Sequence, residues 1–150
     1  MELTLKGRTV RGTYTSVRYK PGMKFDYAIY VPPCTNPDGS YAVAIDHDGL
    51  PTANCAALDT LAASGEAPWT VVFGLCSATL PAGIDGGTNR GMRFNNYDLY
   101  SPEYADFVVD EAIPALAAEH HLTLSPSPDM HMATGGSSGG ISSWSIAFIS

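Results

Sequence analysis

Gly135-Gly136-Ser137-Ser138-Gly139-Gly140 is the stretch that decides the fold of this 150-residue chain. A short apolar run at residues 130–134 precedes it, and a second apolar segment at residues 141–148 follows it. The order strand, Gly-x-Ser-x-Gly, helix predicts a nucleophile elbow, a tight turn that holds a serine hydroxyl at the end of a β-sheet. A flexible linker rich in glycine and serine is the alternative interpretation, and the apolar flanks argue against it.

The Gly-x-Ser-x-Gly pattern fits this stretch in two registers. One register makes Ser137 the nucleophile, and the register one residue later makes Ser138 the nucleophile. We favour Ser137, because Gly135 then follows the strand directly while Gly139 and Gly140 open the helix. Backbone N–H groups at the start of that helix would face an oxyanion.

The composition is that of a single globular domain or a piece of a larger one. Apolar residues make up 45% and charged residues only 15%, against about a quarter in typical domains, which favours a sheet covered on both faces. The formal net charge of −7 argues against a nucleic-acid partner, which requires a basic surface. No apolar stretch reaches the ~18 residues of a membrane span and no signal peptide is visible, so we expect no membrane partner and, by default, a cytoplasmic protein.

Neither a metal site nor a disulfide framework is predicted. Cys34, Cys55 and Cys76 form no C-x-x-C pair, and each is interpreted as a small buried apolar residue. The run Asp-His-Asp at residues 46–48 contains three metal-ligating side chains, but adjacent strand residues point to opposite faces and do not converge. We therefore expect no metal and no cofactor.

Strand and helix patterns alternate along the chain. We expect exposed strands within residues 3–19, strands at 25–31, 41–45, 69–75 and 130–134, a helix over 54–64, a helix that begins at Ser101 and is kinked by Pro114, and the elbow helix. This alternation predicts an α/β fold with a mostly parallel sheet and helices on both faces. Residues 76–100 show little periodicity and much glycine, and a loop of that length is usually functional or disordered.

The chain resembles α/β-hydrolase esterases of the enterochelin-esterase and feruloyl-esterase type, a group that includes esterase D-like proteins. The resemblance covers nearly the whole chain and rests on four segments in order. They are FDYAIYVPP at residues 25–33, DHDG at 46–49, the pieces NR, YD, YADF and DEAIP between residues 89 and 114, and GGSSGG at 135–140. Together these segments are specific for the fold and weak for the substrate.

The resemblance implies a serine carboxylesterase in which Ser137 is the nucleophile. The oxyanion hole would use the N–H groups of Ser138 and Leu50, with Gly49 allowing the backbone to approach the substrate. The implied substrate is a small-molecule ester of a sugar, a hydroxycinnamate or a siderophore lactone. Related sequences often carry a glutamate where this chain has Asn96, which weakens any inference about substrate binding by that loop.

The resemblance also implies a catalytic acid and a histidine that follow the elbow, within about three further strands. The chain ends at Ser150, so we predict that residues 1–150 are the N-terminal portion of a single esterase domain, with the C-terminal strands and two members of the triad missing. The alternative is a truncated, inactive half-domain that needs a complementing partner. It could also self-associate through the strand at residues 130–134, which would be left as an apolar edge.

The chain contains four histidines, and each is a candidate replacement for the missing base, because a serine nucleophile needs a base within hydrogen-bond reach. His47 follows a buried strand and could lie near the elbow, but we favour a loop-shaping role. His131 is interpreted as a packing or hydrogen-bonding residue. His120 and His121 are interpreted as a solvated helix end, where positive charge is favourable.

Overall fold

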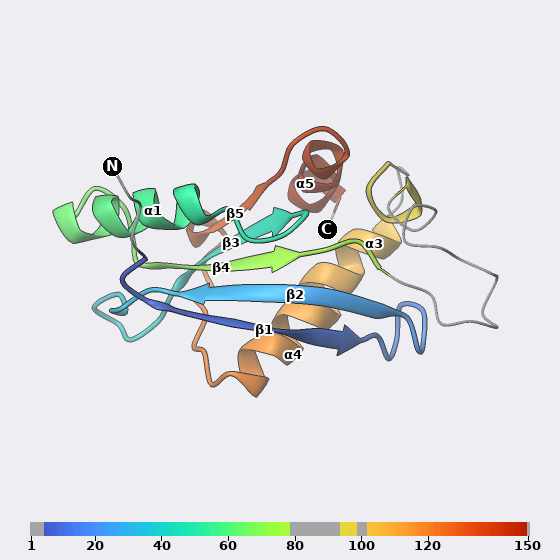
Figure 1. The fold of residues 1–150 in the computed structure, drawn as a ribbon, viewed down its shortest axis with the longest axis horizontal. Coiled ribbons are helices and arrows are strands. Elements are labelled where there is room, and N and C mark those ends of the chain that lie inside the picture. Colours follow the sequence, from blue (N-terminus) through green and yellow to red (C-terminus); the bar gives the residue numbers. More distant parts are fainter. Residues whose placement is uncertain (1–4, 79–93, 99–101, 150) are drawn as a thin grey trace.

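The computed structural model describes residues 5–78, 94–98 and 102–149 (Figure 1). Its strands are β1 (Arg8–Thr15), β2 (Lys24–Val31), β3 (Ala42–His47), β4 (Thr70–Leu75) and β5 (His131–Thr134). Its α-helices are α1 (Thr52–Ser64), α3 (Pro102–Asp106), α4 (Ile113–Glu119) and α5 (Ser138–Ile149). Three other helical segments are η1 (Phe94–Asp98) and η2 (Phe107–Ala112), both π-helical, and the 3-10 turn η3 (Pro128–Met130).

The five strands form one sheet in the order β1-β2-β4-β3-β5. β1 pairs antiparallel with β2, and β2 pairs antiparallel with β4. β3 pairs parallel with both β4 and β5. The predicted parallel arrangement therefore holds for β4, β3 and β5, the part of the sheet that leads to the elbow. The exposed edge strand predicted within residues 3–19 is β1.

Helices cover both faces of this sheet, as predicted (Figure 1). On one face, Val43 and Phe73 belong to a core that includes the buried side chains of α3, η2 and α4 together with Ile146 of α5. On the other face, Ala44 and Val72 pack with residues of α1. The central strands are therefore apolar on both faces, which explains the continuous apolar runs in the sequence.

The helix predicted to be kinked by Pro114 contains a π-helical segment directly before that residue. Proline has no N–H and cannot complete the regular helical hydrogen-bond ladder. Just before it, the N–H of Ile113 bonds to the carbonyl of Val108, five residues back, which is the π-helical spacing. Ser101, the predicted N-cap, lies outside the described residues, as does most of the predicted loop at residues 76–100.

Glu111 attaches the β1–β2 hairpin to this helix. Its carboxylate accepts hydrogen bonds from the hydroxyls of Tyr14 and Ser16 and from the N–H groups of Val17, Arg18 and Tyr19. Burial acts to raise the pKa of Glu111, but the hydrogen bonds from these backbone N–H groups and from the Ser16 hydroxyl outweigh it and hold the pKa below its ordinary value. We call this set of contacts the Glu111 clasp.

The three cysteines differ in exposure. Cys55 is buried and Cys76 is half-buried, but Cys34 is exposed, so the interpretation of Cys34 as a buried residue is wrong. It lies in the segment after β2, beyond two prolines that end the strand, where the neighbouring residues 33–35 are also exposed. In the part of the chain that the structure describes, no helix has both the length and the apolar character needed to cross a membrane.

Candidate active site

The elbow is a three-residue turn, because β5 ends at Thr134 and α5 begins at Ser138. Its last residue, Ser137, has a φ of 54°, in the left-handed region that non-glycine residues rarely adopt, at a cost of about 1–3 kcal/mol. Ser138 already lies inside the helix. The two candidate serines therefore differ: only Ser137 occupies the sharp, strained position that a nucleophile elbow gives its serine.

Close contacts surround three of the elbow glycines. A β-carbon added at Gly135 would lie 2.5 Å from the carbonyl group of Gly139. At Gly139 it would lie 3.1 Å from the β-carbon of His47, and at Gly140 it would lie 3.3 Å from the Gly135 oxygen. At Gly136 it would meet nothing within 4 Å. Gly135, the first glycine of the register that makes Ser137 the nucleophile, therefore leaves no room for a side chain, whereas Gly136, the first glycine of the other register, does; Gly139 and Gly140 are both tight.

The loop between β3 and α1, which carries Leu50, also approaches its neighbours closely. Asp48 and Gly49 both have positive φ, at 76° and 115°. A β-carbon at Gly74 of β4 would lie 2.5 Å from the Gly49 oxygen and 2.8 Å from the Leu50 nitrogen. Sequence reasoning missed Gly74, although an isolated glycine in a buried strand is a recognised sign of close backbone approach.

His47 lies beneath the elbow and is only 3% exposed. Its Nε2 is 3.0 Å from the hydroxyl of Ser142, and its Nδ1 is 3.3 Å from the hydroxyl of Ser143 and 3.4 Å from the carbonyl of Thr134. The rings of Tyr97 and Tyr104 pack against it, with centroids 5.0 Å and 5.9 Å away. Both ring nitrogens thus face the strand and helix that flank the elbow.

The other histidines lie elsewhere in the fold. Nε2 of His131 is 2.6 Å from the carbonyl of Ser125, which agrees with the expected hydrogen-bonding role. His120 lies at the end of α4, as predicted, but it is only partly solvated, because its Nε2 is 3.0 Å from the hydroxyl of Tyr27 in the sheet. His121 is exposed, with a φ of 56°.

The edge of the sheet beside the elbow is apolar and open. Within the residues that the structure describes, β5 pairs with β3 alone, and its Met132 is 46% exposed. On α5, Ile141, Trp144 and Phe148 are 49%, 52% and 73% exposed. We call the surface made by these four side chains the open edge. α5 contains no charged residue, and a helix without a charged face is normally covered.

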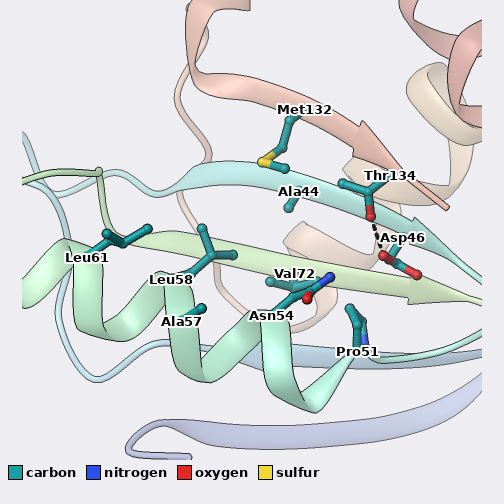
Figure 2. A pocket seen from close by; sticks show the side chains of 10 residues that line it. All are labelled: Ala44, Asp46, Pro51, Asn54, Ala57, Leu58, Leu61, Val72, Met132 and Thr134. Atoms are coloured by element: carbon teal, nitrogen blue, oxygen red, sulfur yellow. Dashed lines mark hydrogen bonds between the residues drawn. The ribbon is translucent and has the colours of Figure 1, made fainter.

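An apolar hollow adjoins the open edge between α1 and the sheet (Figure 2). Met132 lines it from β5, and Leu58 and Leu61 line it from α1. At one end, the Thr134 hydroxyl donates a hydrogen bond to the Asp46 carboxylate. Burial raises the pKa of Asp46, and the hydrogen bond from Thr134 opposes that shift. Within the described residues, no group of three or more histidine, cysteine or acidic side chains is placed to hold a metal ion.

Comparison with solved structures identifies the fold. The chain superposes on a ferulic acid esterase with a TM-score of 0.60 at 17% identity, covering 93% of this chain and 54% of that one. The enterobactin hydrolase IroE in complex with DFP gives a TM-score of 0.58 at 15% identity, with coverage of 90% and 55%. An S-formylglutathione hydrolase from Agrobacterium tumefaciens gives 0.55 at 21% identity, with coverage of 96% and 54%.

These matches show that the chain has the α/β-hydrolase fold, as the resemblance in the sequence predicted. The chain spans about half the length of the structures that it matches. No protein-family model matches the sequence, and neither does any curated protein. The likeness to esterases therefore rests on the three-dimensional arrangement.

Proposed function

We propose that this chain carries the nucleophile half of a serine carboxylesterase site. The observation that carries the proposal is the elbow: Ser137 has a left-handed backbone between β5 and α5, and glycines at positions 135 and 139 make room for it. The structures with this fold that we matched include proteins described as a ferulic acid esterase and an enterobactin hydrolase. Both descriptions are consistent with an ester substrate.

In the proposed reaction, the Ser137 hydroxyl attacks the carbonyl carbon of the ester. A base takes the serine proton as the new bond forms, and the alcohol leaves when the tetrahedral intermediate collapses to an acyl-serine. The N–H groups of Ser138 and Leu50 would stabilise the oxyanion. The close approach of the Gly49–Leu50 backbone to Gly74 supports this role, because it fixes the loop that presents Leu50.

The base and its orienting acid belong to the remainder of the proposed domain. We propose that residues 1–150 are the N-terminal portion of a single esterase domain, whose second portion supplies the histidine and the acid. The coverage of about half of each matched structure supports this division. The substrate that we propose is a small-molecule ester of a hydroxycinnamate, a siderophore lactone or a sugar, with no cofactor.

Labelling with a serine-directed fluorophosphonate, read by intact-mass spectrometry, tests the nucleophile. Because the oxyanion hole still supports a residual reaction when the base is missing, we expect wild type and Ser138→Ala to gain one adduct on long incubation and Ser137→Ala to gain none. Loss of the adduct only in Ser138→Ala would show that the second register is correct. No adduct on wild type would contradict an activated serine in this chain.

The two neighbouring glycines provide a matched control for the geometry of the elbow. Gly135→Ala places a methyl group against the Gly139 carbonyl, whereas Gly136→Ala places one in open space. We therefore expect labelling to fall steeply in Gly135→Ala and to persist in Gly136→Ala. Equal labelling of the two variants would show that the reactivity of the serine does not depend on the close contact between position 135 and the Gly139 carbonyl.

The open edge supports a second candidate, an inactive half-domain that self-associates or needs a complementing partner. An apolar strand that lies at the edge of the described sheet, as β5 does, can pair with another chain, and the exposed Trp144 and Phe148 add apolar surface beside it. Light scattering over a range of concentrations tests self-association. A well-folded monomer at every concentration would contradict that form of the candidate.

A further inference from the structure

The hydrogen bonds around His47 determine which ring nitrogen carries the proton. The hydroxyl of Ser143 donates to the carbonyl of Gly139 over 2.8 Å, so it can only accept from the imidazole. The second group facing Nδ1 is the carbonyl of Thr134, which is an acceptor. Because both groups near Nδ1 accept, Nδ1 must carry a hydrogen, shared between them at 3.3 Å and 3.4 Å.

The opposite nitrogen has the complementary role. Nε2 of His47 lies 3.0 Å from the hydroxyl of Ser142, a group that can donate. A neutral imidazole with its hydrogen on Nδ1 accepts that hydroxyl hydrogen at Nε2. Three contacts from the strand and helix on either side of the elbow thus fit a neutral imidazole with its hydrogen on Nδ1.

The location of these contacts gives His47 a mechanical role. Thr134 is the last residue of β5, directly before the turn, and Ser142 and Ser143 lie in α5 after it. The imidazole thus joins the two ends of the turn that contains Ser137. The β-carbon of His47 also lies against Gly139, and the rings of Tyr97 and Tyr104 restrict the imidazole from other directions.

We propose that His47 is a positioning residue, fixed as the neutral Nδ1–H tautomer, that holds the elbow closed and keeps Ser137 in its left-handed conformation. The effect on catalysis rests on the proposed function of Ser137. The tautomer and the rigidity of the elbow do not rest on it and are measured separately.

Nitrogen-15 NMR of the histidine side chains in the wild-type chain tests the tautomer. His47 is assigned by the loss of its signals in His47→Asn. We expect a protonated Nδ1 and an unprotonated Nε2 at neutral pH. A hydrogen on Nε2, or an imidazolium with both nitrogens protonated, would overturn the proposal.

Two substitutions separate positioning from simple space filling. The side-chain amide N–H of His47→Asn takes the place of the Nδ1 donor, whereas His47→Phe fills the space without any donor. Hydrogen exchange is read at the amides of Gly139, Gly140 and Ile141, which bond to Gly136 and Ser137 across the first turn of α5. We expect faster exchange at these amides in His47→Phe and near wild-type exchange in His47→Asn.

The same variants are then labelled with the fluorophosphonate. We expect the labelling rate of Ser137 to fall in His47→Phe by a factor on the order of ten to a hundred, the range caused by small displacements of a reacting group. We expect His47→Asn to stay within a few-fold of wild type. Equal exchange and equal labelling in the two variants would overturn the positioning role.

Failure of the proposed function and failure of the role proposed for His47 give different results. If wild type is never labelled, the proposed function fails, while the tautomer and the exchange at the elbow still decide the role of His47. If His47→Phe does not fold, Ser142→Ala replaces it. That variant removes only the donor to Nε2, so the Nδ1–H tautomer must persist, and a change of tautomer there would contradict the proposal.

Discussion

β1 and β5 are both edge strands, but their outer surfaces differ in charge and in attachment. β1 carries two exposed arginines, Arg8 and Arg11, and charged side chains on an edge strand discourage pairing with another chain. β5 carries no acidic side chain, lysine or arginine, and its Met132 is nearly half exposed. The first edge is protected from further pairing, and the second is not.

The helices next to the two edges differ in the same way. Next to β1, the helix at residues 102–119 holds the hairpin through the Glu111 clasp, with five donors on one carboxylate. Next to β5, α5 has no charged residue and leaves Trp144 and Phe148 exposed. The contrast shows that the β1 edge is protected against further pairing, whereas the apolar surface at β5 is suited to being covered by further polypeptide.

The largest effect on stability is expected at the β1 edge, where the Glu111 clasp holds the hairpin. Glu111→Gln places an amide N–H₂ against backbone donors that now meet a carboxylate oxygen, so we expect the free energy of unfolding to fall by about 2–4 kcal/mol. Asp110→Asn, on the exposed neighbouring residue, is the control and should stay within about 0.5 kcal/mol of wild type. Urea denaturation measures both. Equal stability of the two variants would show that the clasp does not stabilise the hairpin.

Acid should weaken the same clasp. Because the pKa of Glu111 is held below its ordinary value, the carboxylate stabilises the fold above the ordinary pKa and loses that contribution as the pH falls through the lowered value. The stability gap between wild type and Glu111→Gln should therefore be widest near neutral pH and shrink below about pH 4. Urea denaturation of both proteins at several pH values checks this. A gap that stays constant with pH would contradict the role of the charge.

A smaller effect, on self-association, is expected from a charge placed at the open edge. Met132→Lys places an ammonium group on β5, and we expect any self-association to weaken about tenfold, which is about 1.4 kcal/mol. Thr9→Lys, on the exposed face of β1, is the matched control and should leave association unchanged. Sedimentation measures both. If Thr9→Lys had the larger effect, the two edges would have been assigned the wrong way round.

The smallest effect on stability is expected for the most exposed aromatic side chain. Phe148 is 73% exposed and touches Trp144 at a ring distance of 5.0 Å. Phe148→Ala should therefore change the free energy of unfolding by only about 0.5 kcal/mol, while lowering the binding of a dye that detects apolar surface. A much larger loss of stability would show that α5 is already packed and that the edge is not open.

Sequence reasoning located the elements well because their periodicity is local. The predicted strand at 25–31 is β2, the predicted helix at 54–64 lies within α1, and the elbow helix follows β5 as expected. Strands with apolar residues on both faces and a glycine that ends α1 are visible without knowledge of distant partners. The order of strands in the sheet could not be predicted from these local patterns, because it depends on which distant strands pair.

Contacts between distant residues could not be predicted in this way. Glu111 lies within a helical pattern and gives no sign that a hairpin some ninety residues earlier supplies its five donors. The contacts of His47 could not be predicted for the same reason, because its partners Ser142 and Ser143 are near it only after β3 and β5 have paired. The exposure of Cys34 and the bond between His120 and Tyr27 likewise depend on what packs nearby.

The contact between Gly74 and the backbone of Gly49 and Leu50 has a consequence for how this sequence can change over generations. A side chain at position 74 would meet the Gly49 oxygen at 2.5 Å, so the loop at residues 48–50 would have to move outward to accept it. That movement would displace the Leu50 N–H from the place where the proposed oxyanion is held. Position 74 and the loop are therefore expected to vary together in descendants of this sequence, and a change at either one alone should be removed by selection.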